Sequence, residues 1–147
     1  MTAEEYLRQG RMLDQRIAYH LRKLEELRAS VSSVSSLPLR PDKVQTSPTG
    51  DAPFVRALER IEELQERTDR EIETLVALKI QIEGVIRRLD SDEYQLMLIY
   101  RYLEGMTWEE AADLMHAGVS TLKRWHRDAL DRLVLPENPI SVKDGPV

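Results

Sequence analysis

The apolar residues in the first part of the chain recur at the spacing of an amphipathic helix. Between about Thr2 and Val34 they alternate three and four residues apart, with charged residues between them. Gly10 and His20 occupy two further positions of the same face. This spacing is typical of a coiled coil or a helical hairpin, in which a second helix covers the apolar seam. The seam consists of Tyr6, Leu13, Ile17, Leu24, Leu27, Val31 and Val34.

A second long helix is predicted from about Asp51 to Leu89. Asp51 suits the N-cap, and Pro53 suits the first helical turn. Such a helix is roughly 55 Å long at about 1.5 Å per residue and is not stable alone. We expect it to pack antiparallel against the first helix, and a second copy of the chain is a further candidate partner. Its apolar face contains Phe54, Leu58, Ile61, Thr68, Ile72, Leu75, Ile82, Ile86 and Leu89, widened by Val55, Leu64, Val76, Leu78 and Val85.

Two segments lack this periodicity. Residues 30–51 are rich in serine and proline, which favour turns and interrupt helices, so this segment is predicted to be a long connector. Whether the connector is ordered is left open by the sequence. Pro136 is predicted to end the last helix, and residues 136–147 are expected to be a flexible tail.

Shorter helices are predicted in residues 90–135. Acidic residues beginning at Asp90 mark a helix start, and this helix should continue to Leu103 as the most buried part of the region. Thr107 followed by Glu110 is a capping box at the start of the next helix. In that motif the Thr hydroxyl accepts a backbone N–H, and the Glu carboxylate reaches back to the backbone N–H of the Thr.

A tight turn at residues 116–118 joins the Thr107 helix to a last helix over residues 119–133. A short helix, a tight turn and a longer helix form the helix-turn-helix arrangement that places one helix in a DNA groove. The apolar positions of both helices should face inward. They are Ala111, Leu114 and Met115 in the first helix, and Leu122, Trp125, Ala129, Leu130 and Leu133 in the second.

The polar residues of the last helix form its outward face. Residues 119–134 hold four basic and two acidic side chains, whereas residues 107–115 hold three acidic side chains and no basic one. The net charge of −5 argues against a protein that coats nucleic acid non-specifically, but this local asymmetry suits a DNA reader. The predicted DNA contacts are the side chains of Ser120, Thr121, Lys123, Arg124 and Arg127, with backbone N–H groups at Thr107 holding a phosphate.

This region resembles the fourth conserved region of bacterial sigma factors, through Tyr100-Arg101-Tyr102-Leu103, Thr107-Trp108-Glu109-Glu110 and Ala129-Leu130-Asp131-Arg132-Leu133. About residues 35–134, including Pro41-Asp42-Lys43-Val44-Gln45-Thr46-Ser47-Pro48, are similar to a family of small phage and prophage proteins described as transcriptional regulators. The resemblance implies sequence-specific DNA binding, with RNA polymerase as a candidate partner. One position departs from the motif. It usually has glycine where this chain has His116, because the turn needs a left-handed backbone.

Other functions lack a signature in this chain. It has no cysteine, and His20, His116 and His126 show no metal-ligand spacing. It also lacks a nucleophile elbow and a phosphate-binding glycine motif, so we expect no enzyme activity, metal or cofactor. The longest apolar run, residues 96–100, is too short to span a bilayer, and the N-terminus lacks signal-peptide features. These features predict a cytoplasmic protein without membrane contact.

The sequence therefore predicts an all-α protein with a coiled-coil-like helical hairpin at 1–89, a sigma-region-4-like helix-turn-helix at 90–135 and a tail at 136–147. The expected function is transcription control of phage or prophage genes, with helix 119–133 in the major groove of double-stranded DNA. Two alternatives stay open. One is a small terminase-like component of phage DNA packaging, which would form rings, and the other is a helical protein–protein adaptor that binds no DNA.

Overall fold

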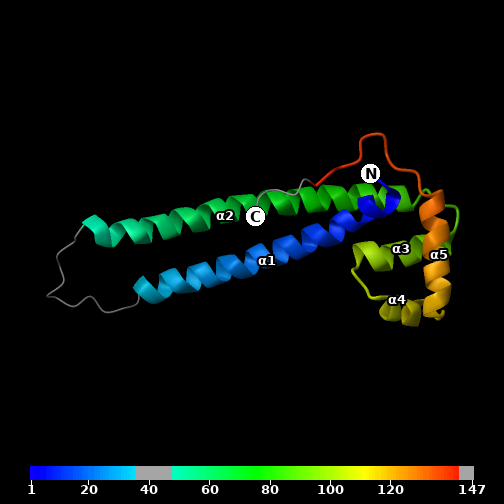
Figure 1. Cartoon of the computed structure of the whole chain (residues 1–147), viewed down its shortest axis with the longest axis horizontal. Helices are drawn as coiled ribbons and strands as arrows, with labels where there is room; N and C mark the ends of the chain where they lie inside the picture. Colours follow the sequence, from blue (N-terminus) through cyan, green and yellow to red (C-terminus); the bar gives the residue numbers. More distant parts are fainter. Residues whose placement is uncertain (36–47, 143–147) are drawn as a thin grey trace. The chain divides into compact units, whose positions relative to one another are not determined.

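The computed structural model describes residues 1–35 and 48–142. These residues form five α-helices and one short π-helix and contain no strand, which confirms the all-helical class (Figure 1). The helices are α1 (Ala3–Ser35), α2 (Pro48–Ile86), α3 (Asp92–Leu98), the π-helix η2 (Ile99–Leu103), α4 (Trp108–Met115) and α5 (Val119–Arg132). Most of the predicted connector, residues 36–47, lies outside the described residues.

Residues 16–72 form one compact unit, in which the described parts of α1 and α2 lie side by side (Figure 1). Polar contacts fix their antiparallel register. His20 Nδ1 is 2.6 Å from Glu71 Oε1, and Arg28 donates a hydrogen bond to Gln65 farther along both helices. Thr68 is fully buried on the seam because its hydroxyl donates to the carbonyl of Leu64, which satisfies a polar group that would otherwise be costly to bury.

The predicted seam of α1 is confirmed at six positions. Leu27 and Val31 are half-buried, whereas the others with described side chains are buried. The wider face predicted for α2 is partly wrong, since Val55, Leu58 and Val76 are 44–54% exposed, and Phe54 and Ile72 are also exposed. One neighbouring helix covers only a narrow strip of α2, so apolar residues at the flanks of that strip stay in solvent. The six confirmed positions are Tyr6, Gly10, Leu13, Ile17, His20 and Leu24.

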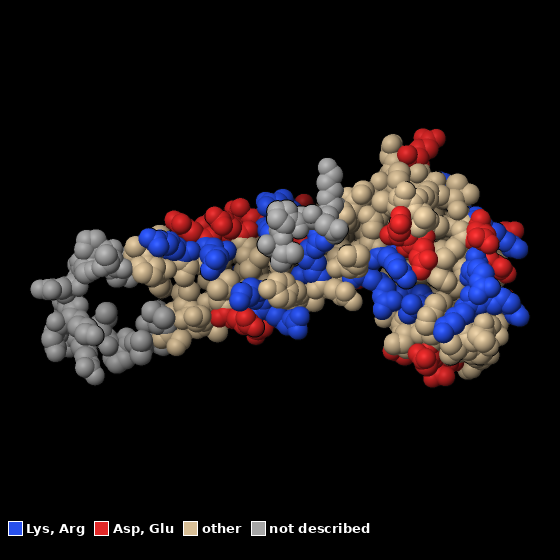
Figure 2. Space-filling model, in the orientation of Figure 1, with Lys and Arg blue, Asp and Glu red and all other residues tan. Residues whose placement is uncertain are grey.

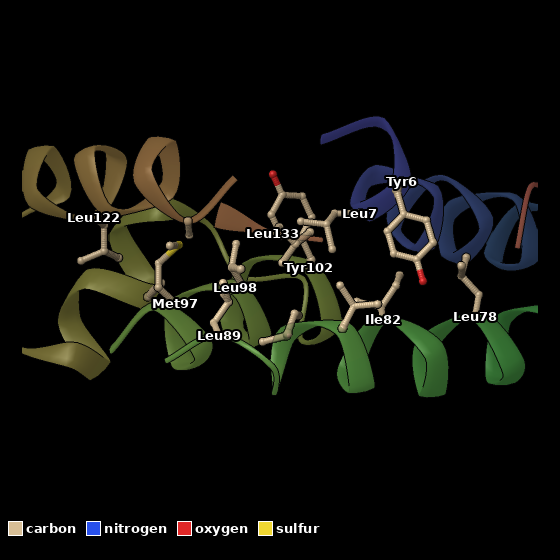
Figure 3. Packing of buried hydrophobic residues seen from close by; sticks show 14 of the residues in the cluster. Tyr6, Leu7, Leu78, Ile82, Leu89, Met97, Leu98, Tyr102, Leu122 and Leu133 are labelled. Carbon is tan, nitrogen blue, oxygen red and sulfur yellow. The ribbon is translucent and has the colours of Figure 1, made fainter. Parts of the chain in front are cut away.

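The second compact unit combines residues 1–15 with 73–147 and is called the core unit below. Side chains from the ends of both long helices meet those of the short helices in one apolar cluster (Figure 3). The cluster extends past the boundary expected at residue 90, since Leu7 and Ile82 are among its members. Members of the cluster include Tyr6, Leu7, Leu78, Ile82, Leu89, Met97, Leu98, Tyr102, Leu122 and Leu133.

The ends of the long helices differ from those predicted. Helix α1 ends at Ser35, one residue past the predicted Val34, and so includes the serine-rich start of the predicted connector, because serine costs a helix at most about 0.7 kcal/mol per residue. Helix α2 begins at Pro48, so Asp51 is not its N-cap and Pro53 lies inside the helix. Only one intrahelical hydrogen bond is lost there, close to the helix start. Helix α2 ends at Ile86, three residues before the predicted end.

The helix predicted over residues 90–103 is split in two. It begins as expected, with the Ser91 side chain accepting the backbone N–H of Tyr94 at 3.3 Å. After Leu98 the backbone changes to a π-helix, closed by a hydrogen bond from Glu104 N to Ile99 O. The extra residue in a π-turn changes the side-chain directions after Leu98. The segment was expected to be the most buried part of the region, but its burial is uneven. Tyr102 is buried, whereas Leu96 is 44% exposed.

The segment 136–142, expected to be loose, packs on the core unit. The side chain of Gln81 accepts the backbone N–H of Ile140 and donates to Asn138 O, and the side chain of Gln9 accepts the N–H of Val142 and donates to Ile140 O. Tyr6 also donates to Gln81 Oε1, and burial raises the pKa of Tyr6 to about 12. Paired backbone groups and half-buried side chains hold this segment, so the expected loose tail is wrong through residue 142.

Candidate nucleic-acid interface

The N-terminus of α4 is fixed by Thr107. Its hydroxyl oxygen accepts the backbone N–H of Glu110 at 3.1 Å, as the capping box predicted. The Glu110 carboxylate contacts the Thr107 hydroxyl, which donates to Oε1 at 3.1 Å, and not the backbone N–H of Thr107 as the capping box predicted. Both hydrogen-bonding functions of this hydroxyl are therefore used inside the protein. A phosphate at this end of α4 would bind to backbone N–H groups, not to the Thr107 side chain.

The turn after α4 depends on His116. This residue has φ 51° and ψ 43° and is the one non-glycine residue with positive φ among those described. Its N–H bonds to Asp113 O, and the N–H of Ala117 bonds to Ala112 O, which closes the helix in the manner of a Schellman turn. Histidine thus takes the left-handed conformation that glycine usually supplies in this motif, at some steric cost.

One face of α5 packs against the core unit. Leu122 and Ala129 are buried, and Trp125 is half-buried beside Tyr94. Tyr94 also donates its phenol hydrogen to Asp128 Oδ2 at 3.1 Å, which ties α3 to α5. The predicted inner face of α5 is confirmed in this respect. The outward direction expected for Asp128 is only partly right, because its carboxylate reaches α3.

The inner face of α4 is narrower than predicted. Ala111 and Ala112 are buried and Met115 is half-buried, but Leu114 is 54% exposed. The prediction that Leu114 faces inward is wrong. At about 100° per residue, Leu114 lies roughly opposite Ala112 on the helix, so both cannot enter the same core. Two alanines on the inner side let α5 approach α4 closely.

The opposite face of α5 carries the polar residues predicted to contact DNA. Ser120, Lys123, Arg124 and Arg127 are exposed, and Thr121 is half-buried. The first turn of α5 has no acidic residue, and its N-cap, Gly118, makes no side-chain hydrogen bond. Figure 2 shows basic side chains, with acidic ones among them, in the region of α5. The structure therefore places the five side chains that were predicted to contact DNA on one face of α5, beginning near its N-terminus.

A second basic group includes Arg8, Arg11 and Arg101. The sequence offered Arg101 alone as either a phosphate contact or an ion-pair partner of Glu104 or Glu109, and did not indicate the group. The guanidinium of Arg101 lies 4.2 Å from the centre of the Trp108 ring, and its Nη1 donates to Met106 O at 2.7 Å. Its Nε is buried without a hydrogen-bond partner. Burial lowers the pKa of Arg101, and the positive charges of Arg11 and Arg8 lower it further. Only the three-dimensional packing of α1 beside η2 could reveal this group.

Trp108, which contacts Arg101, belongs to an aromatic cluster with His126 and Tyr102. The ring of His126 stacks on Tyr102 and meets Trp108 edge-on, with ring-centre distances of 5.8 and 5.1 Å. The Tyr102 hydroxyl is 2.6 Å from His126 Nε2. Burial lowers the pKa of His126; Glu4 opposes this shift, whereas Arg101 and Arg8 add to it. The neutral imidazole can then accept the Tyr102 hydrogen at Nε2.

We expect this cluster to make the core unit less stable in acid. An unfolded histidine gains a proton near pH 6.5, whereas folded His126 resists protonation, so stability is present above that pH and is lost as pH falls below it. Urea unfolding followed by tryptophan fluorescence between pH 7.5 and 5.5 measures the effect. The variant His126→Gln keeps an acceptor for Tyr102 and should lose less stability over this range. Equal losses of stability in the unchanged protein and in the variant would contradict the assignment of this pH dependence to His126.

Among residues 1–35 and 48–142, no three His, Asp or Glu side chains are grouped to hold a metal ion. No helix in the same residues is both long and apolar enough to cross a membrane. Comparisons of the chain with protein-family models, with curated proteins and with solved structures find no match.

Proposed function

We propose that this chain is a sequence-specific DNA-binding regulator of transcription, encoded by a phage or prophage. In this proposal α1 and α2 form a helical hairpin, and α4, the His116 turn and α5 form a helix-turn-helix. The observation that carries it is the two-sided character of α5. Leu122 and Ala129 anchor one face in the core, while Lys123, Arg124 and Arg127 stand in solvent on the other. A helix held this way can enter a major groove without unfolding its own unit.

The proposed contacts divide into two kinds. Side chains near the N-terminus of α5, Ser120, Thr121 and Arg124, reach base edges, because recognition helices use their N-terminal residues for bases. Lys123 and Arg127 neutralise phosphates. Backbone N–H groups at the start of α4 bind a further phosphate, because a helix N-terminus favours an anion.

The second basic group is a further candidate for a phosphate contact. Arg8 is paired with Glu4 at 2.9 Å, which leaves the charges of Arg11 and Arg101 as the larger attraction for a phosphate. The ring of Trp108 holds the guanidinium of Arg101 in one direction. A preorganised cation loses less side-chain entropy on binding than a free one, so this group suits a backbone contact that positions the protein on DNA.

We expect a single chain to bind DNA with modest affinity. The protein has a net charge of −5, and few cations face the proposed groove. A second chain or RNA polymerase would raise the effective concentration of α5 at its site, which can raise affinity by about 10²–10⁴ without a new contact. DNA binding is therefore expected to strengthen when either partner is present.

The test is binding of the purified full chain to DNA fragments from its own genomic neighbourhood, in the presence of excess unrelated DNA. Saturable binding to one fragment that resists the competitor supports the proposal. The same assay is repeated with RNA polymerase present. Absence of binding to every fragment at low salt, with and without polymerase, would contradict the proposal and favour the adaptor alternative.

A further inference from the structure

An exposed apolar strip on α2 is left uncovered by the other described residues, 1–35 and 48–142. Val76 is 54% exposed and Ile80 is 68% exposed, the highest value among the described exposed large hydrophobic residues of the two long helices. Gly84 follows four residues later on the same face and is also exposed. Glu73 and Arg87 lie at the two ends of the strip, and all five residues belong to the core unit. This strip is called the α2 outer face below.

The α2 outer face is distinct from the side of α2 that packs on α1. That inner side contains Leu78 and Ile82, which are fully buried, and is flanked by an ion pair of 3.2 Å between Lys79 and Asp14. Burying an apolar side chain such as Ile80 contributes about 1.5–3 kcal/mol. Leaving Ile80 in solvent forgoes that contribution, which a contact with another helix would recover.

Gly84 adds an independent observation. It lies inside α2, where glycine destabilises a helix by about 1 kcal/mol relative to alanine. A Cβ placed on Gly84 would meet nothing within 4 Å, so no contact within the described chain requires glycine there. A glycine on the surface of a helix does allow the backbone of a second helix to approach closely. Its position in line with Ile80 and Val76 places such an approach on the α2 outer face.

The residues of this face are arranged symmetrically about Ile80, so the face is complementary to a second copy of itself that runs in the opposite direction. If two copies of α2 cross antiparallel about a two-fold axis at Ile80, Glu73 faces Arg87 of the partner subunit. Val76 then faces Gly84 of the partner subunit, and the two Ile80 side chains meet at the axis. Each contact occurs twice, as an isologous dimer requires. This arrangement needs two kinds of match. An acidic residue must lie opposite a basic one, and a branched side chain must lie opposite a glycine.

We propose that the α2 outer face, residues 73–87, is the surface through which two copies of this chain associate antiparallel about Ile80. Arg87, the first residue after α2, already pairs with Glu83 at 2.7 Å, and Glu73 of the partner subunit adds a second carboxylate to it. The contact involves a single helix from each chain, so its area is small and the dimer should form at micromolar concentration. The proposal concerns assembly in the absence of DNA and stands or falls independently of the proposed function.

The first experiment uses the lack of cysteine in the chain. In the variant Ile80→Cys, the new thiol meets its own copy at the two-fold axis, so mild oxidation should give a disulfide-linked dimer rapidly. The control is Leu114→Cys, a comparably exposed apolar position on α4. The reaction is compared with and without urea. Equal rates of cross-linking for the two variants under native conditions would overturn the proposal.

The second experiment tests the register by charge exchange in the full chain. Sedimentation equilibrium should show that Glu73→Arg and Arg87→Glu each weaken the dimer by about tenfold or more, because each places like charges opposite one another. The double variant should restore association, since it reinstates opposite charges. Both residues are exposed, so neither change should disturb folding. A protein that stays monomeric at high micromolar concentration, or a dimer indifferent to both changes, would overturn the proposal.

Discussion

Replacing Lys123, Arg124 and Arg127 together by alanine should weaken DNA binding by at least about 100-fold. All three side chains are exposed on the outer face of α5, and a direct contact from such a cation to a phosphate or base contributes about 1–3 kcal/mol. Even the lower value, summed over three contacts, corresponds to more than 100-fold in affinity. Fluorescence anisotropy with the preferred genomic fragment measures the loss, and circular dichroism checks that the helices persist.

The matched control removes the same charge elsewhere. Arg22, Lys23 and Arg60 are exposed residues of α1 and α2, and their joint replacement by alanine changes the net charge equally. This control should leave affinity within about threefold, because charges outside the contact surface act mainly through the screened field of the protein. Equal losses in both triple variants would mean that α5 is not the contact surface, and only the total charge matters.

Leu122→Ala should destabilise the core unit by about 3 kcal/mol. Leu122 is fully buried in the cluster that joins α5 to the ends of the long helices, and removing its methyl groups loses burial and leaves a cavity (Figure 3). Both tryptophans of the chain, Trp108 and Trp125, lie in this unit, so their fluorescence reports its unfolding in urea. The variant should also bind DNA less tightly at temperatures where part of the unit is unfolded.

Leu114→Ala is the matched control for that change. It is the same substitution in the neighbouring helix, at a side chain that is 54% exposed. Its effect on the free energy of unfolding should stay within about 0.5 kcal/mol, as for other surface positions. A loss at Leu114 as large as that at Leu122 would contradict the orientation of α4 and support the inward direction that the sequence pattern suggested.

The contrast between these two leucines shows what periodicity can predict. A long helix repeats its pattern over many turns, so the seam through Leu13, Ile17 and Leu24 is specified several times over and was predicted correctly. Helix α4 has only eight residues, and two alanines beside a leucine do not define a face. Which of them enters the core depends on how closely α5 approaches, and that is a property of the packed unit.

Helix caps and turns could be predicted where one backbone geometry favours a particular residue type. The Thr107 cap and the left-handed backbone at residue 116 follow from the needs of a helix start and a tight turn. The π-helix η2 and the packed segment 136–142 were missed because neither has a local sequence signature. The side chains of Gln9 and Gln81 hold that segment from more than fifty residues away, and such pairs become visible only in the folded chain.

The candidate interface also contains some residues that the sequence could identify and others that it could not. The outward residues of α5 could be named from helical spacing, because three of them are charged and the opposite positions are apolar. Arg8 and Arg11 could not be named, since they join Arg101 only through the packing of α1 against the short helices, which places Gly10 near the carbonyl of Tyr102. The sequence therefore predicted the outward basic residues of α5 but missed the second basic group.

The most direct test of the central proposal is a salt series of DNA binding by the full chain and by the Lys123, Arg124 and Arg127 triple alanine variant. The logarithm of the binding constant should fall linearly with the logarithm of salt concentration, at about 0.9 for each phosphate neutralised. The proposal predicts saturable binding, with a slope for the variant that is shallower by up to about 2–3, according to how many of the three side chains contact phosphate. No binding at low salt, or equal slopes and affinities for the two proteins, would contradict it.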